Sequence, residues 1–146
     1  MPDENRETET SEPEAVAARS SRELIEAIVE LLRKENPSET DIDKLLVELS
    51  HELDRCVASQ IAEGIYDDAV QRAPWLTGDA ERLKQQQTAL RQSLQALRML
   101  VSRGGGSSES LAQRFDEFAE LYTEHEAAEQ DFLQAAFPGP DWALQS

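Results

Sequence analysis

The segment from Leu111 to Ala136 constrains the fold more than any other part of the chain. Alternating steps of four and three residues along it select one continuous face of an α-helix, because a helix completes a turn every ~3.6 residues. The residues on this face are Leu111, Phe115, Phe118, Tyr122, His125, Glu129, Phe132 and Ala136. Six of the eight are apolar or aromatic, so the pattern predicts a long helix packed against a core.

The two polar residues on this face are His125 and Glu129, which lie one helical turn apart. Their side chains should therefore point into the core with their apolar neighbours. A charged group buried without a partner costs several kcal/mol, so other parts of the chain are expected to supply hydrogen-bonding partners for this pair.

Composition favours a single all-α domain. The chain has 146 residues, of which 39% are hydrophobic, enough for one core but not for two. Aromatic residues make up only 5%, and the abundant residues are good helix formers. The single cysteine, Cys56, excludes an intrachain disulfide and any metal site built from two or more thiolates.

The charge of the chain argues against two classes of partner. The formal net charge is −16, from 30 acidic and 14 basic residues, which would repel nucleic acid and anionic membrane surfaces. We therefore expect neither as a partner. The sequence also contains no run of 18 apolar residues and begins without a basic or apolar leader, so we expect a cytoplasmic protein.

Local signals divide the chain into a domain with two tails. Residues 1–19 are predicted to be a disordered acidic tail, residues 20–138 the folded domain, and residues 139–146 a C-terminal tail in which Trp142 could pack on the domain or serve for docking. Four helices are expected, at about 20–35, 41–71, 79–102 and 109–136. The main signals are a capping box at Ser20, a cap at Ser38 or Thr40, and a break at Pro74.

Four helices with short connections bury their apolar faces most simply as an up-down-up-down four-helix bundle. In that arrangement the polar residues of three helices should meet at one level. Gln87 and His125 lie about 17 and 19 residues from the loop that joins their helices, and Glu63 lies about as far from the preceding turn as Gln87. We therefore predict a polar layer made of Glu63, Gln87, His125 and Glu129.

These residues resemble the hemerythrin-like family, also called the hemerythrin HHE cation-binding domain, over about residues 20–138. The family's H-x-x-x-E motif is matched by His125 to Glu129, and its aromatic-proline stop by Phe137 and Pro138. The family's L-x-x-E-H-x-x-L motif aligns with residues 83–90, where glutamines replace the acid and the histidine. Its other H-x-x-x-E motif aligns with residues 59–63, where Ser59 replaces the histidine.

The resemblance implies a bundle fold and a site for two irons that binds or senses oxygen. By position, Glu63 and Glu129 would be the bridging carboxylates and His125 a terminal ligand. Ser59 and Gln87 stand where the family has histidine and are poor ligands. Because the chain contains only two histidines, it cannot build a di-iron centre of the family's type.

Two interpretations of the layer follow. In the first, the polar side chains only satisfy one another, the chain binds no cofactor, and the domain is a non-enzymatic binding or sensory module with a protein partner. In the alternative, Glu63, His125 and Glu129 retain a reduced site for iron, zinc or another divalent metal. The other histidine, His51, is predicted to lie on the surface or between helices, and Cys56 in the core. No motif in the sequence indicates catalysis, so we do not expect an enzyme.

Overall fold

The computed structural model describes residues 19–104 and 107–139, and this part of the chain is helical with no β-strand. Its α-helices are α2 (Ser21–Leu32), α3 (Glu39–Glu63), α4 (Ile65–Arg72), α5 (Thr77–Ser102) and α6 (Ser108–Ala136), with a short 3₁₀ helix, η1, at Pro74–Leu76. The predicted all-α class is confirmed. Nearly all residues of both predicted tails, including Trp142, lie outside the described part.

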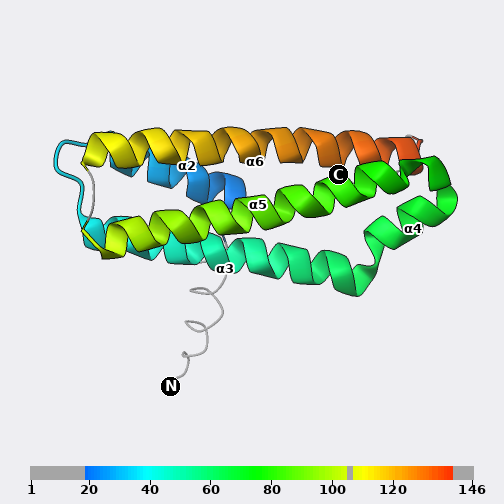
Figure 1. Ribbon diagram of the computed structural model, residues 1–146, viewed down its shortest axis with the longest axis horizontal. Coiled ribbons are helices and arrows are strands. Elements are labelled where there is room, and N and C mark those ends of the chain that lie inside the picture. Colours follow the sequence, from blue (N-terminus) through cyan, green and yellow to red (C-terminus); the bar gives the residue numbers. More distant parts are fainter. Residues whose placement is uncertain (1–18, 105–106, 140–146) are drawn as a thin grey trace, which may run out of the picture.

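The longer helices run side by side (Figure 1). Helix α2 packs on α3 and α6, and α5 packs on the same two helices from the other side. Helix α4 leads from the end of α3 towards the start of α5 and also contacts α6. Among the described residues no helix has the length and apolar character needed to cross a membrane.

The buried residues form two apolar clusters along this assembly. The first joins α2 to one half of α3, α5 and α6. It includes Leu94 and three completely buried residues, Ile28, Leu49 and Phe118. The second joins α4 and η1 to the other half of α5 and α6 and is centred on Phe132. With 12 residues, α2 is about 18 Å long and covers less than half of the 29-residue α6, so α4 and η1 cover the remainder.

The helix starts largely follow the sequence signals. Ser20 and Glu23 form the predicted capping box, in which the Ser20 hydroxyl accepts from the Glu23 N–H and the Glu23 carboxylate accepts from the Ser20 N–H. Ser38, rather than Thr40, caps α3, and its hydroxyl accepts from the Asp41 N–H over 3.3 Å. Helix α2 ends at Leu32, three residues before the predicted end, ahead of the left-handed Asn36.

The main difference from the predicted helices is a break at Gly64. The expected continuous helix over 41–71 is wrong, because α3 ends at Glu63 and α4 begins at Ile65. Gly64 has φ 63° and ψ 31°, a left-handed conformation that glycine adopts at little cost and that ends a helix. Consequently α4 does not continue in line with α3 (Figure 1).

Candidate functional site

Four polar side chains from α3, α4, α5 and α6 form a closed ring of hydrogen bonds, which we call the polar ring: Gln60, Tyr66, Gln87 and Glu129. Glu129 Oε2 accepts from Gln60 Nε2 and from the Tyr66 hydroxyl, each over 2.6 Å. Gln87 Nε2 donates to Gln60 Oε1 over 2.6 Å and to the Tyr66 oxygen over 3.1 Å. The ring therefore links the long helices α3, α5 and α6 with the short helix α4.

The ring has a fixed direction of donation. A carboxylate can only accept, and an amide nitrogen only donates. Gln60 and Tyr66 therefore each accept from Gln87 and donate to Glu129. Burial raises the pKa of the Tyr66 hydroxyl well above its usual value of about 10, and the hydrogen bond to Glu129 raises it further. Tyr66 therefore remains protonated and keeps its role as a donor to Glu129.

The break at Gly64 places Tyr66 in this ring. In a continuous helix, at ~100° per residue, Tyr66 would point about 120° away from Gln60 around the axis. The left-handed turn at Gly64 redirects α4, so both side chains reach the same carboxylate oxygen. The Tyr66 ring also packs edge-on against Phe132, with ring centroids 5.4 Å apart, which fixes the hydroxyl beside Glu129.

His125 is buried beside the ring and has a separate partner. Its Nδ1 lies 2.8 Å from Gln86 Oε1, and because that oxygen can only accept, Nδ1 carries the proton in the neutral imidazole. The other nitrogen, Nε2, then holds a lone pair. Burial lowers the pKa of His125, against an opposing effect of Glu129 and Glu126, so the neutral form is favoured at pH 7.

A small cavity of about 100 Å³ adjoins both His125 and the polar ring. His125 and Glu129 line it from α6, Gln60 and Cys56 from α3, and Gln87 from α5. Cys56 is half-buried, and burial followed by the charge of Glu52 raises the pKa of its thiol. Since a raised pKa keeps the sulfur protonated, Cys56 is neither a strong nucleophile nor a ready metal ligand in this state.

The structure does not bring the three predicted metal ligands together. His125 and Glu129 face the same cavity, but Glu63 is exposed, and its nearest hydrogen-bond partner is the Ser59 hydroxyl at 3.4 Å. The prediction that Glu63 belongs to the polar layer is therefore wrong. Within residues 19–104 and 107–139, no three His, Cys, Asp or Glu side chains are grouped closely enough to hold a metal ion.

Glu63 lies outside the polar ring because of the break at Gly64. The predicted height of Glu63 assumes one continuous helix up to the following turn, whereas α4 runs at an angle to α3. Gln60, about one turn earlier, stands at the level of the ring instead. Gln87 is at the predicted level, and His51 is exposed as predicted.

Sequence reasoning missed three residues of the site: Gln60, Tyr66 and Gln86. Signals in the sequence could have found two of them, Tyr66 and Gln86. A glycine within a helical pattern marks a candidate break, so Gly64 could have placed Tyr66 on a separate helix. Gln86 directly precedes Gln87, and a buried histidine requires an acceptor or donor on a neighbouring helix.

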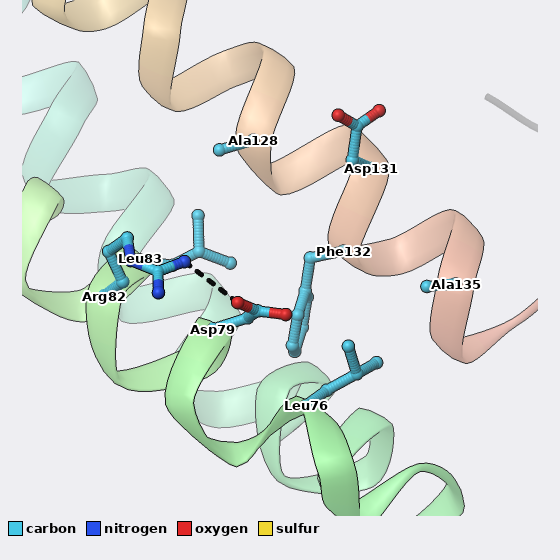
Figure 2. Close-up of a pocket in the computed structure, with 8 residues that line it drawn as sticks. All are labelled: Leu76, Asp79, Arg82, Leu83, Ala128, Asp131, Phe132 and Ala135. Carbon is cyan, nitrogen blue, oxygen red and sulfur yellow. Dashed lines mark hydrogen bonds and ion pairs between the residues drawn. The ribbon is translucent and has the colours of Figure 1, made fainter.

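A second hollow, of about 240 Å³, lies where η1 and α5 meet the end of α6 (Figure 2). Its apolar floor includes Leu76, Leu83 and Phe132. The charges at its rim are already paired in part, because Arg82 Nη1 lies 2.9 Å from Asp79 Oδ1. Figure 2 shows Phe132 directed from α6 towards the start of α5, so this hollow lies behind the packing that supports Tyr66.

Comparisons of the chain with protein-family models, with curated proteins and with solved structures gave no match. The resemblance to hemerythrin-like domains therefore stays a prediction from the residues quoted above.

Proposed function

We propose that this chain is a non-enzymatic binding or sensory module built on an up-down-up-down four-helix bundle, similar in arrangement to hemerythrin-like domains. In this proposal a ring of hydrogen bonds replaces the layer of metal ligands. The packing of α2, α3, α5 and α6 on one another supports the bundle arrangement. The position of the polar ring between two apolar clusters supports the comparison with an internal ligand layer.

The observation that carries the proposal is the double hydrogen bond to Glu129 Oε2. The family's bridging carboxylate would have its charge neutralised by metal ions. Here the corresponding carboxylate accepts from an amide and a phenol, each over 2.6 Å. Hydrogen bonds to an ionised group are about twice as strong as those between neutral groups, so the carboxylate is stabilised without a cation.

Metal analysis combined with thermal melting tests this function. Full-length protein is expressed with added ferrous, zinc or manganese salt, and the bound metal is measured after purification. We expect well below one equivalent of each metal and no change in melting temperature on adding any of them. A binder of the native state would raise the melting temperature by ordinary linkage, and stabilisation would grow with the metal concentration.

Two variants separate the proposed function from its alternative, a reduced metal site at Glu63, His125 and Glu129. If metal stabilises the wild type and both His125→Gln and Glu63→Gln abolish that effect, the alternative is correct. His51→Gln is the matched control, because it removes an exposed histidine from the same chain. Metal stabilisation that survives His125→Gln would point to another site and would also contradict the present proposal.

A further inference from the structure

The largest hollow adjoining the polar ring is a cleft of about 410 Å³ between α3 and α5, beside the Gly64 break. Its volume falls in the range of about 300–1,000 Å³ that is typical of small-molecule sites. On each of the two helices the lining residues recur at steps of three and four, so each helix contributes one continuous face. The turn of α4 away from α3 leaves these two faces without a covering helix at this end (Figure 1).

One wall of the cleft is apolar and open to solvent. It is formed by Val57 and Ile61 on α3. Ile61 is 74% exposed, the second most exposed of the large hydrophobic residues in the described part of the chain. A single exposed isoleucine is common on protein surfaces, but here it adjoins a concave site and supplies apolar area that a ligand could cover.

The floor of the cleft consists of three members of the polar ring, Gln60, Tyr66 and Gln87. The Gln87 amide nitrogen uses both hydrogens within the ring, for Gln60 and Tyr66. The Gln60 amide nitrogen gives one hydrogen to Glu129, and its second N–H is not used in the hydrogen bonds among the described residues. Gln60 therefore keeps one N–H from which a ligand could accept.

Two basic side chains and one acidic side chain line the mouth of the cleft. Lys84 and Arg91 line it from α5, and Asp67 is the acidic residue that faces it from α4. Arg91 Nε bonds to Asp54 over 2.9 Å, whereas Lys84 Nζ lies 3.9 Å from its nearest carboxylate, that of Glu81. Lys84 is therefore the cation most available to a ligand.

We propose that this cleft binds a small carboxylate with a flexible apolar body. The body lies on Val57 and Ile61, and the carboxylate meets Lys84 and the free Gln60 N–H. One available cation and an opposing Asp67 suit a single negative charge better than a phosphate dianion. The inference rests on the proposed binding function and assigns a ligand class to that function.

Titration with three probes that share one apolar body tests the ligand class. Hexanoate, hexan-1-ol and hexylamine are added separately to ¹⁵N-labelled full-length protein at pH 7. The side-chain amide signals of Gln60 and Gln87 report directly on the cleft. We expect saturable shifts of both signals with hexanoate, weaker binding of the alcohol, and the weakest binding of the amine, since its charge would oppose Lys84.

Two substitutions test the assigned contacts. Lys84→Gln should weaken hexanoate binding by at least about threefold while leaving hexan-1-ol binding unchanged, as expected for loss of a partly exposed ion pair. Lys44→Gln, at an exposed lysine elsewhere on α3, should leave both affinities at the wild-type value. Ile61→Gln should weaken hexanoate and hexan-1-ol binding to a similar extent, because both probes share the same apolar body.

Three results would overturn the inference: no saturable shift at about 10 mM hexanoate, where a ligand of Kd 1 mM would fill most sites; hexylamine binding at least as tightly as hexanoate; or an unchanged hexanoate affinity in Lys84→Gln. None of these results depends on metal. A failed ligand test with metal-free, metal-insensitive protein therefore removes the carboxylate site and leaves the proposed function standing. Tight metal binding together with intact hexanoate binding would contradict the proposed function and leave the carboxylate site standing.

Discussion

The Tyr66 hydroxyl on α4 donates to Glu129 Oε2 on α6 over 2.6 Å, although 63 residues separate them in the chain. This hydrogen bond attaches a helix of 8 residues to a helix of 29 residues. Only two residues of the short helix, Tyr66 and Ala69, are buried in the second apolar cluster, so this hydrogen bond should matter for the position of α4.

Tyr66→Phe should lower the free energy of unfolding by about 1–3 kcal/mol. The variant keeps the edge-on packing against Phe132 but deprives Glu129 of one donor and Gln87 of one acceptor. Chemical denaturation of the wild type, Tyr66→Phe, Glu129→Leu and the double variant gives the coupling between the two residues. A coupling energy below about 0.5 kcal/mol would contradict a direct bond between them.

Replacing the whole polar ring by apolar residues should be far less damaging than breaking it. Glu129→Leu alone should cost about 2–4 kcal/mol, because the Gln60 amide and Tyr66 hydroxyl lose their acceptor while remaining partly buried. The combination of Gln60→Leu, Tyr66→Phe, Gln87→Leu and Glu129→Leu removes all of these groups together. Its unfolding free energy should lie within about 1 kcal/mol of the wild type, and a larger loss than for Glu129→Leu would show that the ring itself is strongly stabilising.

Gly64→Ala should destabilise the protein by about 1–2 kcal/mol. An added Cβ at Gly64 meets no atom within 4 Å, so the cost comes from the left-handed backbone, which is unfavourable for an L-residue with a side chain. Gly78→Ala is the matched control. It lies within helix α5, where an added Cβ also meets nothing, and alanine there should stabilise by up to about 1 kcal/mol. Equal effects of the two variants in thermal melts would argue against the break.

Stability should fall as the pH is lowered below about 6.5, in part because of His125. Burial lowers its pKa in the folded state, so the unfolded chain binds the proton first. The neutral imidazole therefore contributes its full stabilisation above pH 6.5, the pKa of histidine in the unfolded chain. This contribution decreases as the pH falls towards the lower pKa of the folded state. His125→Gln should reduce the slope of unfolding free energy against pH between 5 and 6.5, as measured by urea denaturation. A slope equal to that of the wild type would contradict burial of a neutral His125.

The long apolar face of α6 could be predicted from sequence because a single period governs all 26 residues between Leu111 and Ala136. Every aromatic residue on that face except the half-buried Tyr122 is buried in the structure, and His125 is 7% exposed. The relative heights of Gln87 and the α6 pair were also predictable, because α5 and α6 are uninterrupted helices joined by one connection.

The composition of the polar ring could not be predicted in the same way. The wrong placement of Glu63 and the omission of Tyr66 share one cause, the left-handed residue Gly64 in a segment whose periodicity continues on both sides. Periodicity reports which residues share a face of a straight helix and carries no information on a change of axis. Long-range partners such as Gln86 and His125 depend on the packing of separate helices, which local patterns do not encode.

The division of the interior into two apolar clusters has a consequence for the order in which the protein opens. Helix α2 contributes only to the first cluster and α4 only to the second, whereas α5 and α6 contribute to both. Contiguous regions of a native protein can unfold transiently as separate cooperative units. Amide protons of α4 and of α2 should therefore exchange with solvent in two distinct groups, and those at the centres of α5 and α6 should exchange last. The cleft between α3 and α5 beside Gly64 can then open and close while the half of the molecule around α2 remains folded.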